Sequence, residues 1–205
     1  RTHARARSRR CSGLRATCSP ARTSPTARSS TATSSFGRPS PLDVEAIGPI
    51  AWGVDGREMQ YAAVDILARH ATEARPDLLD VVAGLVTNKP WWDTIDPSAA
   101  KVVGPLVRQY PALVANLDAW IAGDDLWLAR TAILHQLGFK EATDVDRLFR
   151  YCLAWAGCPD FFARKAIGWA LRQYAYTDPD AVRGFLAEHG DVLSPLTSLE
   201  GAKDL

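Results

Sequence analysis

Residues 125–137 read DLWLARTAILHQL, an apolar-rich stretch that recurs in altered form elsewhere in the chain. Comparable stretches begin at residue 57 (REMQYAAVDIL), at residue 91 (WWDTIDPSAAKVV) and at residue 160 (DFFARKAIGWALRQY). The four starts are 34, 34 and 35 residues apart, and Ala132 and Ala166 fall at like places, each followed by isoleucine. A constant interval in the mid-thirties indicates that the chain is built from repeated structural units.

Each of these stretches follows another segment in which apolar residues recur at three- and four-residue steps, the spacing of an amphipathic helix. The expected helices are 43–54, 56–70, 76–87, 90–109, 111–122, 125–137, 143–156, 160–175 and 179–188, with a frayed helix near 195–203. No stretch alternates like an exposed strand. Two helices per unit predict an all-α fold, an α-solenoid of paired antiparallel helices of the HEAT or TPR type. Such a stack is curved, and its second helices line one face, commonly the concave one.

Residues 1–42 differ in composition from the rest, with nine arginines and no acidic residue. They are rich in Ser, Thr, Ala and Pro, show no helical period, and cannot bury enough apolar surface to order themselves. This segment is interpreted as a disordered basic tail that grips phosphates, as disorder without a role, or as a gene start read out of frame; we favour the last. The repeat domain then spans residues 43–205.

The repeat domain carries 15 basic and 23 acidic residues, a net charge of −8, which argues against general nucleic-acid affinity. No apolar run has the 18 or more residues of a membrane helix, and no secretory signal precedes the domain, so a cytoplasmic location is expected. Four cysteines (Cys11, Cys18, Cys152 and Cys158) lack the spacing of a zinc site and are interpreted as free thiols.

Four residues on the second helices are expected to meet on one surface. Trp92 and Asp96 are four residues apart and share a helical face, Arg130 lies 34 residues beyond Asp96, and Trp169 lies 39 beyond Arg130. Two indole faces and a carboxylate suit a cation, with cation–π attraction worth about 0.5–2 kcal/mol per ring. Arg130 is suited to an anion such as phosphate.

Each of these residues also has an ordinary structural interpretation. Tryptophan in a helical repeat is usually core, as we assign Trp52, Trp91, Trp120, Trp127 and Trp155. Because Asp96 precedes Pro97, it is also a candidate N-cap of a helix over 97–109. Arg130 has possible partners in Asp124 and Asp125, or in acids of a neighbouring repeat.

The stretches NKPWWDTID, DDLWLARTAILHQLGFK and FFARKAIGWALRQYAYTDPDAV resemble the DNA alkylation repair glycosylases of the AlkD type, which are built from HEAT-like repeats. The resemblance covers residues 43–205. It implies a monofunctional glycosylase that removes cationic alkylated purines, such as 3-methyladenine and 7-methylguanine, from duplex DNA. By this likeness Asp96 is the catalytic carboxylate, Trp92 and Trp169 contact the sugar of the damaged nucleotide, and Arg130 contacts a phosphate.

The chemistry of such a reaction is consistent with these residue types. An N-alkylated purine is already positively charged and leaves without an added acid, while oxocarbenium character develops on the sugar. A preplaced carboxylate stabilises that charge and positions water. No metal or organic cofactor is expected, and the resemblance implies that the lesion stays in the stack rather than flipping into a pocket.

Further cations are candidates for phosphate contacts, or else ordinary surface charges: Arg57, Lys101, Arg108, Arg164, Lys165 and Arg172. A monomer bound to alkylated double-stranded DNA is expected. The family normally opens with helices that complete the DNA cleft, whereas residues 1–42 hold no Tyr or Trp, so the first repeat should expose an apolar face. The alternative function is a non-catalytic HEAT-repeat scaffold that binds nucleic acid or protein.

Overall fold

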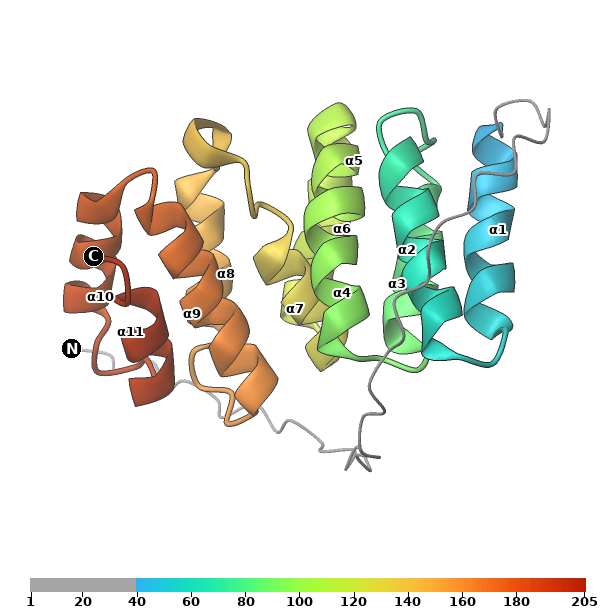
Figure 1. Ribbon diagram of the computed structural model, residues 1–205. Coiled ribbons are helices and arrows are strands. Elements are labelled where there is room, and N and C mark those ends of the chain that lie inside the picture. Colours follow the sequence, from blue (N-terminus) through green and yellow to red (C-terminus); the bar gives the residue numbers. More distant parts are fainter. Residues whose placement is uncertain (1–39) are drawn as a thin grey trace.

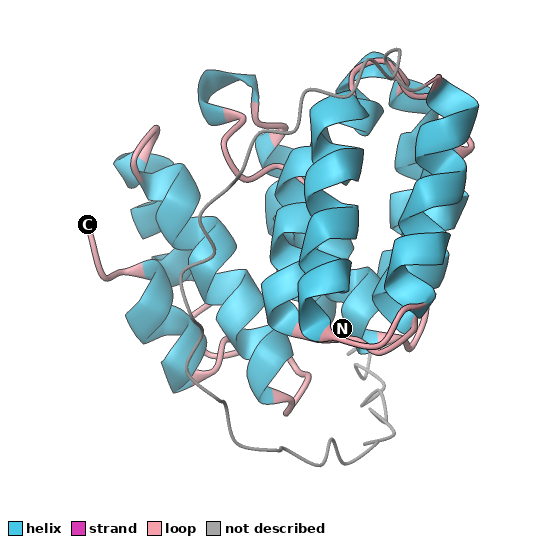
Figure 2. Cartoon of the chain, turned by 45° about the vertical axis from the view of Figure 1, so that its right-hand side comes forward, coloured by secondary structure: helices cyan, strands magenta, loops and turns pink. Residues whose placement is uncertain are grey.

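The regular structure of residues 40–205, the part described by the computed structural model, consists of helices without any β-strand (Figures 1 and 2). In chain order these are α1 (Pro41–Gly53), α2 (Arg57–His70), α3 (Leu78–Thr87), α4 (Trp92–Ser98), α5 (Gly104–Gln109), α6 (Val114–Ala122), α7 (Leu126–Leu134), α8 (Val145–Trp155), α9 (Phe161–Ala175), α10 (Pro179–Glu188) and α11 (Pro195–Gly201). Each predicted end lies within three residues of an observed one. The all-α prediction is therefore confirmed.

The helices form two stacked layers, which is the arrangement of a helical solenoid. In one layer α2 contacts α4, α4 contacts α7, α7 contacts α9 and α9 contacts α11. In the other, α1 contacts α3 and α6 contacts α8, and Figure 1 shows the stack running from α1 at one end to α10 and α11 at the other. The second helices of successive pairs thus share one layer, as the repeat predicted.

Aspartate and serine side chains begin most of these helices. Asp125, Asp144, Asp160 and Asp178 each accept a hydrogen bond from a backbone N–H of the first turn that follows. Ser40 forms a reciprocal capping box with Asp43, so α1 begins two residues before the predicted boundary. The predicted basic segment, residues 1–42, otherwise falls almost wholly outside the described residues.

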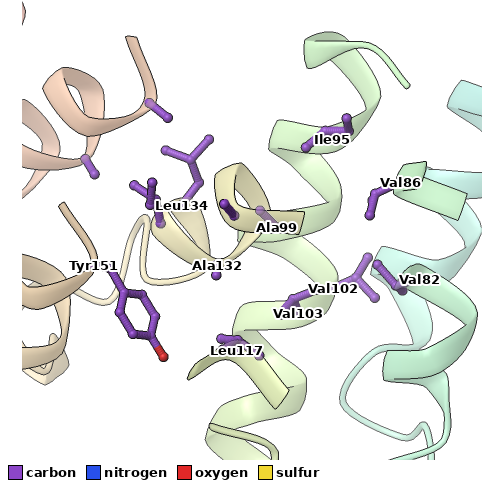
Figure 3. Packing of buried hydrophobic residues seen from close by; sticks show 14 of the residues in the cluster. Val82, Val86, Ile95, Ala99, Val102, Val103, Leu117, Ala132, Leu134 and Tyr151 are labelled. Carbon is purple, nitrogen blue, oxygen red and sulfur yellow. The ribbon is translucent and has the colours of Figure 1, made fainter. Parts of the chain in front are cut away.

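Apolar side chains fill the space between the two layers, and Figure 3 shows part of this core around Ile95, Val102 and Leu134. Trp52 and Trp155 are 1 % and 4 % exposed, so their assignment to packing is confirmed. Their indole N–H groups donate to Asn88 O at 2.8 Å and to Ile121 O at 3.0 Å, each 34–36 residues away. Polar bonds therefore join neighbouring repeats at the interval of the sequence repeat.

The helix that carries Asp96 is continuous from Trp92 to Gln109 but changes its winding at Ala99–Val103, a π-helical turn. There the N–H of Gly104 bonds to Ala99 O, five residues back. A Cβ on Gly104 would lie 2.3 Å from His135 O, so only glycine allows this close approach to the end of α7. Such π-helical turns are frequent at functional sites.

Asp96 lies inside this helix, and the alternative that it caps a helix over 97–109 is wrong. The helix begins at Trp92 and passes through Pro97, which gives up the backbone bond to Asp93. Asp96 consequently shares its helix with Trp92.

The first repeat exposes the apolar side chains of Leu42, Ile50 and Val54. None of the helices formed by residues 40–205 is both long enough and apolar enough to cross a membrane.

Candidate active site

A pocket of about 300 Å³ opens where α4, α7, α9 and α11 meet. It is lined by Trp92, Asp96, Arg130, Phe161, Phe162, Lys165, Trp169, Arg172 and Glu200. All four residues of the predicted constellation are in this lining, although they come from three repeats. The layered stack brings them together because each lies on a second helix.

Asp96 and Arg130 form a bidentate ion pair at the floor of the pocket. Arg130 Nε donates to Asp96 Oδ1 at 2.7 Å, and Arg130 Nη2 donates to Oδ2 at 2.8 Å. The two side chains are 8 % and 5 % exposed. Arg130 thus has the neighbouring-repeat partner that was the ordinary alternative to a phosphate, and its direct contact with DNA stays a prediction.

The electrostatic environment of Asp96 contains two opposing influences. Burial raises the pKa of the Asp96 carboxyl above its ordinary value, and the nearby charge of Asp93 adds to this. The hydrogen bonds and positive charge of Arg130 act in the other direction and favour the carboxylate. A buried carboxylate that lines an open pocket is suited to stabilising a positive charge that develops on a ligand in that pocket.

The two tryptophans of the constellation differ in how they are held. Trp92 is 47 % exposed, which is unusual for so large an apolar side chain. Trp169 is half-buried and packs against the core. Together with Asp96 they also line an adjoining pocket of about 550 Å³ that reaches Lys101, Gly138 and Gln173.

Phe162 supports the pocket from within. Its ring contacts Trp91 edge-on, with centroids 5.4 Å apart, and Trp127 at 5.2 Å. Its carbonyl accepts a hydrogen bond from Arg130 Nη1 at 2.5 Å, so the third nitrogen of that guanidinium is also fixed. Sequence reasoning missed Phe162 and the 53 %-exposed Phe161, although both lie in the stretch that carried the family resemblance.

Comparison with known proteins agrees with this geometry. The family model for DNA alkylation repair enzymes matches residues 32–205. The chain belongs to the DNA alkylation repair family. A solved structure described as a predicted DNA alkylation repair enzyme from Enterococcus faecalis shares 30 % identity with it, with a TM-score of 0.70. That match covers 80 % of this chain and 76 % of the other. A search of curated proteins finds no match.

In this DNA alkylation repair protein, three further cations predicted to bind DNA are held by acids. Arg57 on α2 bonds to Asp93, which also accepts from Tyr61 Oη at 2.6 Å. Lys165 and Arg172, both on α9, bond to opposite oxygens of Glu200 on α11. Glu200 was not predicted, since nothing in its local sequence marks it.

Of the three remaining predicted DNA contacts of this family member, Lys101 and Arg108 are exposed and Arg164 is half-buried. Lys101 is exposed beside the adjoining pocket, and Arg108 is exposed with its guanidinium 5.1 Å from the Phe139 ring centroid. Arg164 is half-buried and bonds to the carbonyl of Asp160 at 3.3 Å. Their roles in DNA binding stay predictions.

Several buried titratable side chains of this repair protein lie outside the pocket, in the packed interior. Cys152 is a buried free thiol whose pKa is raised by burial, and Cys158 is buried as well. Burial lowers the pKa of His135 to about 4. Among residues 40–205 there is no group of three or more His, Cys, Asp or Glu side chains arranged to hold a metal ion.

Proposed function

We propose that this repair-family protein is a monofunctional DNA glycosylase that hydrolyses the N-glycosidic bond of cationic alkylated purines in duplex DNA. The substrates are lesions such as 3-methyladenine and 7-methylguanine. The observation that carries the proposal is the meeting of a buried carboxylate, Asp96, with the half-exposed Trp92 and with Trp169 in one open pocket.

The reaction is a substitution at C1′ of the deoxyribose. The C1′–N bond breaks and its electron pair neutralises the purine cation, which is why no protonating acid, metal ion or organic cofactor is needed. Water adds to C1′ and releases a proton. Asp96 stabilises the oxocarbenium-like sugar and accepts a hydrogen bond from the attacking water.

The tryptophans act on the same positive charge. Their indole faces attract a cationic sugar, and the effect grows when water is excluded by the bound duplex. Trp92 is 47 % exposed, so its ring is accessible to a sugar that remains part of the duplex. The family resemblance implies that the lesion stays stacked and is approached from its backbone, without extrusion into a pocket, and an exposed Trp92 is compatible with that.

Arg130 serves first as the group that keeps Asp96 ionised and oriented. Two of its three side-chain hydrogen bonds go to the oxygens of Asp96 and the third goes to Phe162 O, so the guanidinium holds the Asp96 carboxylate in place. Contact between Arg130 and a phosphate beside the lesion would have to share or replace one of these bonds, because all three guanidinium nitrogens are engaged.

The decisive experiment compares release of 7-methylguanine from methylated duplex DNA by wild type, Asp96→Asn and Asp80→Asn. Asp80 is an exposed residue of α3 in the other layer and controls for the loss of one negative charge. We expect Asp96→Asn to lose release by two or more orders of magnitude while it retains a native helical spectrum and DNA binding.

Equal release by wild type and Asp96→Asn would remove Asp96 from the mechanism. No release by a well-folded wild type that binds duplex DNA would favour the alternative of a non-catalytic scaffold.

A further inference from the structure

Glu200 holds two cations at the rim of the pocket. Lys165 Nζ lies 2.5 Å from Glu200 Oε2, and Arg172 Nη1 contacts Glu200 Oε1. Each carboxylate oxygen therefore has its own cation, the arrangement in which two non-bridging oxygens of a phosphodiester would also be bound. Arg172 has a second acidic neighbour, since its Nε lies 3.8 Å from Asp204 Oδ2.

These three side chains line the same pocket as Asp96, Trp92 and Trp169. The side chains of Lys165, Arg172 and Glu200 are 35 %, 21 % and 14 % exposed, in contrast to 5 % for Arg130 and 8 % for Asp96. The Glu200 pair is therefore reachable by a ligand that enters the pocket, whereas the Asp96 pair forms its floor.

The backbone of α11 around Glu200 is packed closely against α9. A Cβ on Gly168 would lie 2.6 Å from Glu200 Cβ and 3.0 Å from Thr197 O, which shows how closely α11 packs on α9. Thr197 Oγ1 also donates to Arg164 O at 3.2 Å. Exchange of the Glu200 carboxylate for another anion would therefore have to occur by rotation of its side chain rather than by movement of α11.

The net negative charge of the domain makes Lys165 and Arg172 important for phosphate binding. Residues 43–205 carry a net charge of −8, so phosphates can bind only where cations gather. Arg130, Lys165 and Arg172 in the pocket, and Arg57 outside it, all contact carboxylates. A partly exposed ion pair contributes little stability, so replacement of Glu200 by another anion costs less than opening the buried Asp96 pair.

We propose that Lys165 and Arg172 form a binding site for a DNA phosphodiester, and that Glu200 is an internal anion which occupies the site until DNA displaces it. This inference rests on the proposed function in taking duplex DNA as the ligand, but it does not require base release. Glu200 weakens the hold on undamaged duplex and helps the protein to leave its product.

The test measures the affinity of the full chain for an undamaged duplex as a function of salt, for wild type, Glu200→Gln and Glu188→Gln. Glu188 is exposed on α10 and provides the same change of formal charge outside the pocket. Glu200→Gln should bind about three- to tenfold tighter at 0.1 M salt, since only partly exposed ion pairs are removed. Its slope of log K against log salt should steepen by about 0.9 for one more phosphate neutralised.

The gain should depend on the freed cations. Lys165→Gln by itself should weaken binding and flatten the salt slope, and Lys165→Gln combined with Glu200→Gln should lose the gain. Thermal unfolding verifies that each variant is native. Should Glu200→Gln fail to fold, Lys165→Gln still decides the matter, because wild-type affinity in that variant would overturn the site.

Unchanged or weaker binding by a folded Glu200→Gln, or an equal gain in Glu188→Gln, also overturns the proposal. If wild type and variants alike bind no duplex at low salt, this site and the glycosylase function both fall. If they bind as expected but release no base, only the glycosylase function falls.

Discussion

The geometry of the ion pair between Asp96 and Arg130 predicts how much stability is lost when Arg130 is replaced. In Arg130→Met the carboxylate loses hydrogen bonds of 2.7 and 2.8 Å and has 8 % exposure through which water could replace them. Leaving a buried charge without its partner costs about 3–5 kcal/mol. For a domain of this size, about 2–4 °C of Tm corresponds to each kcal/mol, so Tm should fall by about 6–20 °C.

The assay is urea unfolding of wild type, Arg130→Met, Asp96→Asn and the double variant. The double variant has neither charge in the interior, so it should be at least about 1–2 kcal/mol more stable than the sum of the two single effects predicts. Arg130→Met should also lose base release, because an unpartnered Asp96 takes up a proton. Loss of less than about 1 kcal/mol in Arg130→Met, or strictly additive effects, would refute a coupled buried pair.

Two further predictions concern the pocket. Trp92→Ala should change the free energy of unfolding by about 0.5 kcal/mol or less, since the ring is 47 % exposed. The same substitution should lower base release at least tenfold. Release at the wild-type rate in a single-turnover assay would exclude the ring from the reaction. Base release should also fall as pH is lowered, because the active form of Asp96 is the carboxylate and burial raises its pKa. The half-loss should therefore occur above about pH 3.9, the ordinary aspartate value, and a rate still constant at that pH would contradict the assignment.

The helices were predictable because their signal is local and repeated. Apolar periodicity and Asp or Pro at the joints predicted each helix to within three residues. The interval of 34–35 residues predicted the pairing into a solenoid, since a unit of that length cannot bury its apolar face without a neighbour. This same interval separates the bonded residues Asp96 and Arg130, and also Lys165 and Glu200.

The site was predictable only in part. The spacing indicated that Trp92, Asp96, Arg130 and Trp169 share a surface, and they do line one pocket. It left open whether Asp96 would cap a helix or lie within one, because the residue before a proline disfavours helical geometry but does not exclude it. It also left open the partner of Arg130, which several acids could have provided.

The amino-acid sequence alone determined the all-α class, the repeat, and which residues lie in the same layer of helices. Each of these depends on spacing along a helix. Only the tertiary structure decided which charges neutralise one another. Glu200 reaches Lys165 and Arg172 because Gly168 lets α11 approach α9, and Asp96 is buried because Gly104 and a π-helical turn let its helix pack against α7. Pairing between charges depends on distances of a few ångströms between separate repeats, and no local pattern in the chain encodes them.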